Sequence, residues 1–213
     1  MVARPVIRGV RPDDLPALYE IAVETGDAGE DARALYRDPE LVGHLYAAPY
    51  AVLEPQSALV VEDADGVGGY IVGALDTAAF EARLEDEWWP ALRTRYPDPD
   101  GDPAGWNLDQ TGAWQIRHPG RTPRRLTEPY PSHLHINLKP RLQGQGLGRT
   151  LIETWLALVA AAGSHGAHLG VSPRNTRGLA FYPRCGFTEF QWPTRRPDAG
   201  AIYFVRTLPS SRG

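Results

Sequence analysis

The stretch from Arg141 to Thr150 carries glycines at positions 144, 146 and 148, just ahead of an apolar helical pattern. Glycines at a strand-to-helix turn leave the peptide N–H groups uncovered, and the first turn of a helix carries a partial positive charge. Together these features suit a phosphate group. We therefore expect the backbone amides of this loop to bind a phosphate-bearing ligand. The alternative is a Gly-rich turn that only connects a strand to a helix.

Two common phosphate motifs do not fit this stretch. A P-loop requires Gly-Lys-Ser/Thr after its spacer residues, and no lysine occurs between positions 141 and 150. A dinucleotide-binding turn has the spacing G-x-G-x-x-G near the start of the fold, with an acidic residue about 20 positions later. Here the spacing is G-x-G-x-G and lies late in the chain. The expected ligand is therefore a different phosphate carrier.

A second chemical pattern lies directly before the glycines, in the strand-like run "HLHINL" of residues 133–138. Because side chains alternate along a strand, His133, His135 and Asn137 share one face and the apolar residues share the other. A polar face on a covered strand predicts a wet cleft, and an imidazole with a pKa near neutral can act there as a general base. His133 and His135 are thus candidate general bases. A buried, hydrogen-bonded structural pair is the alternative.

These two regions resemble the GNAT N-acetyltransferases. The stretch from Arg141 to Gly146 is similar to the R/Q-x-x-G-x-G/A signature of that family. Downstream, "VSPRNTRGLAFYPRCGF" at residues 171–187 is similar to the block N-x-x-A-x-x-x-Y-x-x-x-G-F, with Gly178 in the place of the usual alanine. The two spaced motifs also resemble the acetyltransferase-like domain at the C-terminus of O-GlcNAcases and its stand-alone bacterial relatives. Asn137 stands where an acidic residue is expected in that subgroup, so no carboxylate role carries over.

The resemblance implies a fold and a cofactor. The fold is α/β, with a central, mixed but mostly antiparallel sheet of about seven strands that is splayed between strands 4 and 5, and helices on both faces. Acetyl-CoA would insert into the splay, its pantetheine arm against the backbone of residues 136–138 and its diphosphate on the glycine loop. The implied cofactor-binding residues are Ile136, Asn137, Leu138, Arg141, Leu142, Gln143, Gly144, Gln145, Gly146, Leu147, Gly148, Arg149, Thr150, Asn175 and Tyr182.

The resemblance also implies an activity. An acetyl-CoA-dependent N-acetyltransferase would transfer acetyl to a primary amine, on a small molecule or a lysine side chain, by direct attack on the thioester. Tyr182 would be the general acid for the departing thiolate, and a strand amide near Leu138 would polarise the carbonyl. The alternative is a non-catalytic module that binds acyl-CoA for ligand sensing or makes protein contacts, since mammalian domains of this subgroup look like pseudo-enzymes.

The elements that must position these residues follow from periodicity and turn signals. Strands are expected at residues 5–10, on both sides of an Asp-Gly turn within 57–75, and at 133–138, 167–172, 187–192 and 201–208. Helices are expected at 11–26, 31–48 with a break at Pro39, 76–96, 147–163 and 176–185. Alternation of strands and helices predicts one α/β domain over residues 1–213.

Residues 97–131 interrupt this rhythm, since proline recurs at seven positions and apolar runs are few. We expect an inserted loop without a core of its own. The wider insertion, at about residues 86–131, holds four of the six tryptophans, at positions 88, 89, 106 and 114. They would form a lid or an acceptor pocket, or else pack the loop onto the body or bury the surface of a homodimer.

The composition limits the classes of protein and of binding partner that remain possible. With 213 residues, 42% of them hydrophobic, and no apolar run of the roughly 20 residues that span a bilayer, we expect a globular protein without a membrane partner. The N-terminus lacks a secretion signal, which favours the cytoplasm. A net charge of −4 without a basic stripe argues against nucleic acid. The single cysteine, Cys185, cannot form an internal disulfide, and no metal-ligand spacing is visible.

Overall fold

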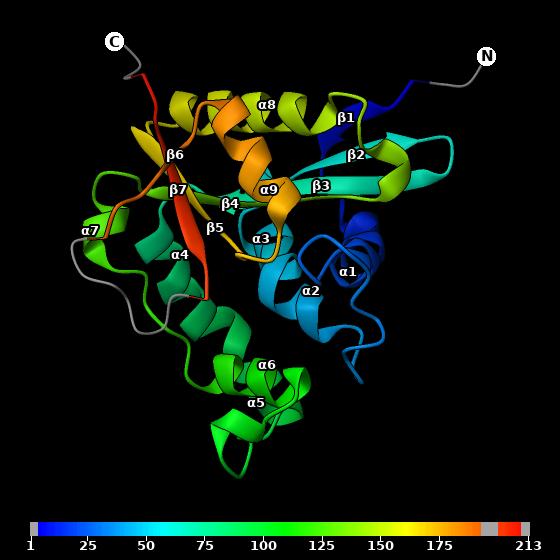
Figure 1. The fold of residues 1–213 in the computed structure, drawn as a ribbon, viewed down its shortest axis with the longest axis vertical. Coiled ribbons are helices and arrows are strands. Elements are labelled where there is room, and N and C mark those ends of the chain that lie inside the picture. Colours follow the sequence, from blue (N-terminus) through cyan, green and yellow to red (C-terminus); the bar gives the residue numbers. More distant parts are fainter. Residues whose placement is uncertain (1–3, 193–199, 210–213) are drawn as a thin grey trace.

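A seven-stranded sheet runs through the molecule (Figure 1). The structure, a computed structural model, describes residues 4–192 and 200–209. All neighbouring strands are antiparallel except β4 and β5, which are parallel. This confirms the mixed, mostly antiparallel sheet. Across the sheet the strands are β1 (Val6–Gly9), β2 (Leu59–Asp63), β3 (Gly66–Ala74), β4 (Ser132–Leu138), β5 (Gly166–Val171), β7 (Ile202–Thr207) and β6 (Thr188–Glu189).

The sheet is splayed between β4 and β5. The two strands pair only at Ser132–Ala167 and His133–His168, and they diverge beyond these positions. On its other edge β4 stays paired with β3 from His133 to Leu138. The expected splay between the fourth and fifth strands is therefore present, and it leaves one edge of β4 open.

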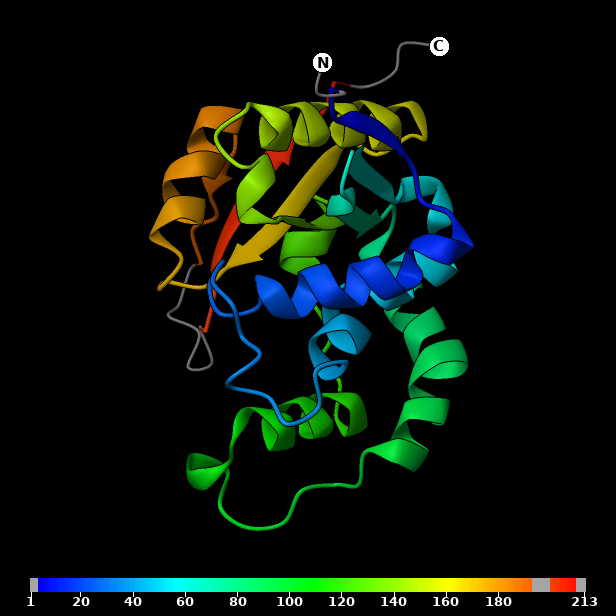
Figure 2. The ribbon, with the colours of Figure 1, turned by 90° about the vertical axis from the view of Figure 1, so that its right-hand side faces the viewer.

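Helices cover both faces of the sheet (Figures 1 and 2). On one face, α8 (Leu147–Ala161) buries a stripe at helical spacing that includes Leu151, Trp155 and Val159. This stripe packs with residues of α9 (Thr176–Phe181) and with Cys185, which is 2% exposed, to form the first hydrophobic cluster. On the other face, residues of α1 (Leu15–Glu24), α3 (Ala48–Leu53) and α4 (Thr77–Arg83) join a second cluster.

The insertion is helical and has a core, which corrects the expectation of a coreless loop. It contains α5 (Trp89–Arg95), α6 (Leu108–Arg117) and α7 (Arg124–Thr127). In the views of Figures 1 and 2, α5 and α6 lie below α1 and α2, away from the sheet. Their third hydrophobic cluster also includes Leu41 of α2 (Leu41–Tyr46) and consists of Leu41, Trp89, Leu92, Tyr96, Ala113 and Ile116.

Several other element boundaries differ from expectation, and α3 (Ala48–Leu53) extends beyond the helix expected over 31–48. Residues 31–40 are not helical, so the second helical stretch begins only at Leu41. The helix expected over 76–96 contains a π-helical turn at Leu84–Trp88, just before Pro90, whose nitrogen cannot donate a helical hydrogen bond. Strand β6 comprises Thr188–Glu189 alone within the expected 187–192.

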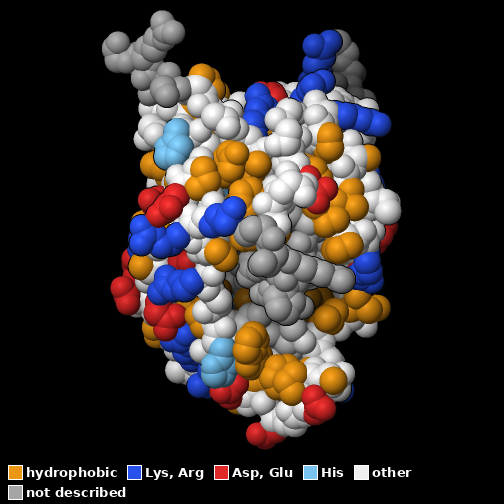
Figure 3. All heavy atoms as spheres, turned by 60° about the vertical axis from the view of Figure 1, so that its left-hand side comes forward, with side chains coloured by type: hydrophobic (Ala, Val, Ile, Leu, Met, Phe, Trp, Pro, Cys, Tyr) orange, Lys and Arg blue, Asp and Glu red, His pale blue; other side chains and the backbone are white. Residues whose placement is uncertain are grey.

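Arginines on the surface commonly meet acidic partners. Arg93 lies 2.7 Å from Glu85, and Arg206 lies 2.7 Å from Glu153. Figure 3 shows basic and acidic side chains interspersed on one face of the molecule. Within the described residues, no helix combines the length and the apolar character that a bilayer crossing requires.

Candidate functional site

The open edge of β4 presents unpaired backbone groups. Lys139 N donates to Gly68 O at 2.8 Å, so the backbone of Lys139 faces β3. Because N–H and C=O groups alternate between the two edges of a strand, those of Ile136 and Leu138 face away from β3, toward the splay. One of them is already used, since Leu138 O accepts a hydrogen bond from Gln143 Nε2 at 2.7 Å. The Ile136 and Leu138 amides remain directed at the open edge.

The glycine loop ends in a set of uncovered amides, which we call the amide cradle and define as the N–H groups of residues 144–149. Leu142 N and Gln143 N bond to carbonyls of the preceding turn. Within the described part of the chain, no protein oxygen accepts from the six amides that follow, and Gly146, the N-cap of α8, supplies no side-chain cap. Backbone donors require partners, so this loop favours an acceptor-rich ligand.

The three glycines have different roles. Gly144 and Gly146 have φ angles of +72° and +80°, a region that other residues rarely adopt, and a Cβ on either would meet no atom within 4 Å. The loop surface there is open. Gly148 lies inside the first turn of α8, and a Cβ on it would be 3.3 Å from the Phe181 ring. Two glycines thus shape the cradle, and the third allows α9 to pack closely.

A cavity of about 960 Å³, which we call the cradle cavity, extends from the open edge of β4 to the amide cradle. It reaches between α9 and the loop that follows α1, where a Cβ on Gly29 would lie 3.9 Å from the Asn175 side chain. It brings together most of the residues expected to bind cofactor. The expected residues that line it are Ile136, Asn137, Leu138, Leu142, Gln143, Gly144, Gly146, Gly148, Arg149, Asn175 and Tyr182, together with His135.

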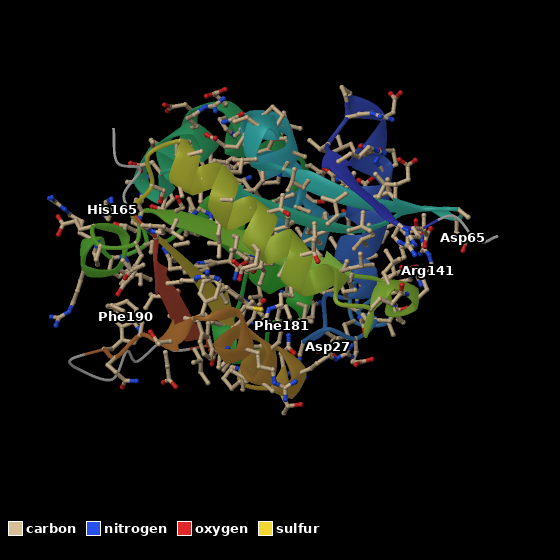
Figure 4. All side chains as sticks on the ribbon, turned by 90° about the horizontal axis from the view of Figure 1, so that it is seen from above. Asp27, Asp65, Arg141, His165, Phe181 and Phe190 are labelled. Atoms are coloured by element: carbon tan, nitrogen blue, oxygen red, sulfur yellow. The ribbon has the colours of Figure 1, made fainter. Side chains whose placement is uncertain are left out.

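Four expected cofactor residues lie outside this lining. The Arg141 guanidinium donates to both Asp63 oxygens, at 2.9 and 3.1 Å, and Figure 4 shows it beside Asp65, far from Phe181. Gln145 Nε2 donates to Arg141 O at 2.7 Å, and Thr150 Oγ1 lies 3.3 Å from Gly146 O within the first turn of α8. Leu147 packs against the first hydrophobic cluster.

Asn175 and Tyr182 frame the far side of the cradle cavity. Asn175 Oδ1 accepts from Gly178 N at 2.7 Å and so caps α9. A Cβ on Gly178 would lie 2.9 Å from the Asn175 side chain, which explains why glycine replaces the usual alanine here. The half-buried Tyr182 ring packs against Phe187 and Phe204, and its hydroxyl has no protein partner among the described residues. Burial raises the pKa of this phenol, so it stays protonated.

Asn137 is tied to α1 rather than free. Its Nδ2 donates to Thr25 Oγ1 at 2.5 Å, and Thr25 Oγ1 in turn donates to Ile21 O at 2.7 Å. The amide therefore fixes the end of α1 against β4 while it lines the cradle cavity. This neutral pair occupies the position where a carboxylate was expected in the subgroup.

The two histidines of β4 are joined by a tyrosine from α3. Tyr50 Oη lies 2.8 Å from His133 Nε2 and 3.1 Å from His135 Nε2. On the other side of His133, Nδ1 lies 2.8 Å from Thr77 Oγ1, which donates to Pro131 O at 2.6 Å. We call this series of groups, from His135 through Tyr50 and His133 to Thr77, the histidine chain.

Hydrogen-bond chemistry fixes the proton positions along the histidine chain. The Thr77 hydroxyl proton goes to the Pro131 carbonyl, so Thr77 Oγ1 must accept from His133 Nδ1. Neutral His133 then has a lone pair on Nε2 and accepts from Tyr50, which in turn accepts from His135 Nε2. By this assignment His135 carries its lone pair on Nδ1, and within the described residues no protein donor meets that nitrogen.

Burial keeps these imidazoles neutral. A third histidine, His168 on β5, donates from Nδ1 to Tyr130 O at 2.7 Å, and its ring lies 5.6 Å from that of His133. Burial lowers the pKa of His135 to about 4, with His168 nearby adding to the effect, and it lowers the pKa of His168 to about 4. Burial, with His168 and His135 nearby, also lowers the pKa of His133 well below its usual value. All three imidazoles are therefore neutral at pH 7.

The histidines face a second cavity of about 560 Å³, which we call the histidine cavity. It lies between β4, β5, α3 and α4, and residues 119–122 of the insertion close one side. Tyr46 and His135 line both cavities, so the two cavities meet at these side chains.

The tryptophans of the insertion divide between the two expected uses. Trp89, which is 5% exposed, belongs to the third hydrophobic cluster and also lines the histidine cavity. Trp88 packs by donating from Nε1 to His44 O at 3.1 Å. Trp106 and the 42% exposed Trp114 lie outside both cavity linings. The insertion therefore contributes to a pocket mainly through Trp89 and the residues after α6.

Sequence reasoning missed Tyr50, Thr77, His168 and Glu81, all of which line the histidine cavity or bond to its histidines. Tyr50 lies 83 positions before His133, and no local pattern links the two. His168 carried a weak signal, because it is a polar residue inside the apolar run "AHLGV". In residues 4–192 and 200–209, no group of three His, Cys, Asp or Glu side chains is arranged to hold a metal ion.

Comparison with known proteins places this geometry in context. A family model for the acetyltransferase (GNAT) domain matches residues 111–189. The crystal structure of a protein named SsHAT superposes with a TM-score of 0.85 at 37% identity, covering 96% of this chain and 98% of that one. Solved structures that share only the fold hold acetyl-CoA.

Two curated relatives match over most of this chain but over only part of their own length. The O-GlcNAcase of Rattus norvegicus is 25% identical over 183 residues, which are 86% of this chain and 20% of the relative. The mycothiol acetyltransferase of Geodermatophilus obscurus is 30% identical over 186 residues, which are 83% of this chain and 58% of the relative.

Proposed function

The chain belongs to the GNAT acetyltransferase family, and from this premise we propose that it acetylates a primary amine bound in the histidine cavity. It is an acyltransferase, and acetyl-CoA is its acyl donor. The acceptor, the residues that act on it and the order of proton transfers are the proposal. When bound, acetyl-CoA supplies the thioester that the amine attacks, which yields an amide and a free thiol.

Cofactor binding would depend on the cradle cavity. The six amides of the cradle offer donors to a diphosphate, and the dipole of α8 adds to the attraction. The backbone of Ile136 and Leu138 at the open edge of β4 would bond to the amides of an extended pantetheine arm, as an added strand does. An amide at this edge would also polarise the thioester carbonyl.

His135 is the proposed general base. It lies where the two cavities meet, and the proton arrangement of the histidine chain leaves its Nδ1 as an acceptor. The proton that the amine loses would pass to Nδ1. Tyr50 and His133 hold the His135 ring and its tautomer, and Tyr50 can take the proton of His135 Nε2 while giving its own to His133 Nε2. His133 would therefore act through Tyr50 and not on the amine itself.

Tyr182 is the proposed acid for the departing thiolate. It lines the cradle cavity, its hydroxyl has no partner among the described residues, and burial raises its pKa and keeps it protonated. A neutral phenol in that position can donate its proton to sulfur and recover it from solvent. Asn175 would help to hold the arm of the cofactor beside it.

The observation that carries the proposal is the junction of the two cavities at His135 and Tyr46. The direct test measures thiol release from acetyl-CoA with a coloured disulfide reagent, in the presence of a panel of primary amines. We expect release that depends on both the amine and the enzyme. If CoA binds in calorimetry but no amine accelerates release above hydrolysis, the chain binds acyl-CoA without this activity, and the proposal fails.

A second measurement addresses the proposed acid. Tyr182→Phe retains the ring that packs against Phe187 and Phe204 and removes only the hydroxyl. We expect CoA affinity to stay within about twofold and kcat to fall about 10- to 100-fold, a fraction of what general acid catalysis can contribute. A variant with unchanged kcat would remove Tyr182 from the mechanism.

A further inference from the structure

One carboxylate faces the histidine cavity. Glu81 belongs to α4, and its side chain is 15% exposed. Its Oε1 accepts a hydrogen bond from Thr122 N at 2.9 Å, which fixes the carboxylate against the insertion. Its Oε2 has a distant ionic neighbour, the exposed Arg121, at 3.9 Å. Among the described lining residues of this cavity, Glu81 is the one acidic side chain.

Glu81 is placed to meet a part of the acceptor that does not react. It lines the histidine cavity but not the cradle cavity, whereas His135 lines both. The reacting nitrogen must lie at the junction, beside His135, because acetyl arrives from the cradle cavity. Glu81 lines the same cavity as Tyr50, and burial, with Tyr46 and Glu81 adding to it, raises the pKa of that phenol.

Apart from Arg121, which lies 3.9 Å from Glu81, the rest of the cavity wall is uncharged and largely aromatic. The rings of Tyr46, Tyr50, Phe80 and Trp89 line it, and the imidazoles are neutral at pH 7 because burial lowers their pKa values. Such a wall accommodates an apolar body, and aromatic faces also attract cations. A volume of about 560 Å³ lies within the range of small-molecule pockets, about 300–1,000 Å³.

These features define a class of acceptor. An amine attacks only as the neutral base, so a carboxylate beside the reacting nitrogen would hold it in the unreactive ammonium form. A carboxylate remote from the junction serves better as the partner of a second cation. We propose that the acceptor is a small primary amine whose apolar body carries a second positively charged group that pairs with Glu81. A diamine is the simplest member, and the inference rests on the proposed acetyl transfer.

The experiment compares four amines that share one reacting group and differ at the far end. They are 1,5-diaminopentane, with a second cation; 1-aminopentane, with a methyl group; 5-aminopentanoate, with an anion; and lysine blocked at both its α-amino and carboxyl groups, which represents a peptide. We expect kcat/KM for the diamine to exceed that for 1-aminopentane about 10- to 100-fold, which is what a charge-assisted pair contributes, with 5-aminopentanoate the poorest.

The variant Glu81→Gln assigns the preference to one side chain. The substituted amide would retain an oxygen for Thr122 N and lose the charge, so kcat/KM for the diamine and for 1-aminopentane should become equal within about threefold. The matched control is Glu87→Gln, which removes a nearby carboxylate that pairs with Arg83 and does not line the cavity. It should keep the wild-type preference. CoA affinity, measured by calorimetry, verifies that both variants are folded.

Each other result overturns the inference in a recognisable way. Preference for 5-aminopentanoate would assign recognition to Arg121, and preference for blocked lysine would indicate a peptide acceptor. If Glu81→Gln still prefers the diamine, Glu81 is not the group that recognises the second cation. In all three cases amines are acetylated, so the proposed function stands while the acceptor class fails. Absence of thiol release with every amine would remove the proposed function itself.

Discussion

Tyr50 Oη lies 2.8 Å from His133 Nε2, a hydrogen bond that joins residues 83 positions apart and connects α3 to the central strand. The same oxygen lies 3.1 Å from His135 Nε2. A single phenol therefore links the two histidine rings, while Thr77 sets the tautomer of His133 by accepting from its Nδ1. Because Tyr50 also stacks on Phe80, with ring centroids 4.4 Å apart, its own position is fixed by packing.

The first prediction concerns this hydroxyl. Tyr50→Phe preserves the stack on Phe80 and leaves His133 Nε2 and His135 Nε2 without their shared partner. We expect kcat to fall about 10- to 100-fold while KM for acetyl-CoA stays within about twofold, because the cradle cavity is untouched. Steady-state kinetics measure both quantities.

The chain offers a matched control for this change. Tyr19→Phe also removes a tyrosine–histidine hydrogen bond, of 2.8 Å to His44 Nδ1, but neither residue lines a cavity. It should lower stability and leave kcat within about twofold. Equal losses of kcat in the two variants would mean that Tyr50 acts through general stability and not through the histidine chain.

The second prediction concerns stability between pH 7 and pH 5. The pKa of His135 and that of His168 are lowered to about 4 in the folded protein, against an unfolded value of about 6.5. The unfolded chain therefore binds more protons over this range, and the free energy of unfolding falls as the pH falls. The contribution is fully present above about pH 6.5 and is lost on the way to pH 4. Urea unfolding should show a loss of about 2–4 kcal/mol between pH 7 and pH 5.

Two variants test the origin of that loss. His168→Gln keeps a donor for Tyr130 O and removes one buried titrating group, so the pH dependence should become shallower. His118→Gln removes an exposed histidine that hydrogen-bonds Asp98 on the surface, and it is the control for the loss of a histidine outside the two cavities. If both variants lose stability with the same slope as the parent, the buried histidines are not responsible.

The third prediction concerns the amide cradle. Gly146→Asp places a carboxylate among amides expected to bind a diphosphate, and it does so at a φ of +80°. We expect CoA affinity to fall by at least about 100-fold, by like-charge repulsion and occupied space. Isothermal calorimetry measures the affinity.

Gly101→Asp separates the backbone cost of this change from its effect on binding. Gly101 has a φ of +87° and open space around it, as Gly146 does, but lies between α5 and α6 and lines neither cavity. Both variants carry the same strain, about 1–2 kcal/mol for a left-handed conformation. Only Gly146→Asp should weaken CoA binding, and an unchanged affinity in that variant would remove the cradle from the proposal.

The fourth prediction distinguishes two arginines near the loop. Arg141→Ala breaks the pair with Asp63 and should lower the melting temperature slightly while CoA affinity stays within about twofold. Arg177 lines the cradle cavity, where it pairs with Glu30 at 3.3 Å, and Arg177→Ala should weaken CoA binding about 3- to 10-fold. The effect should shrink as salt is added. A stronger effect from Arg141 would reverse these assignments and require its side chain to leave Asp63.

The sequence predicted the central strands and helices well because their signals are local. The glycine loop, the apolar stripe of α8 and the alternation of residues 133–138 each lie within one short window. The prediction for the insertion was wrong because prolines were read as breakers throughout. Asn107 and Gln110 form a capping box at the start of α6, a signal present in the sequence that the proline content concealed.

The partners of the two histidines could not be predicted from nearby residues in the sequence. The alternation in β4 placed His133 and His135 on one face, yet Tyr50 and Thr77 reach them from 83 and 56 positions away. The pKa values depend on burial by elements that assemble only in the fold. Arg141 is a second residue whose partner could not be predicted locally. Its position in the motif indicated a ligand contact, but its side chain donates to Asp63, at the turn between β2 and β3.

The burial of Cys185 has a practical consequence. It is the sole cysteine, it is 2% exposed within the first hydrophobic cluster, and it lines neither cavity. The folded protein thus shields its own sulfhydryl from disulfide reagents and offers no sulfur to carry an acyl group. In the thiol-release assay under native conditions, the disulfide reagent therefore reacts with the coenzyme thiol and not with the protein. The rate of colour development then needs no correction for protein thiol.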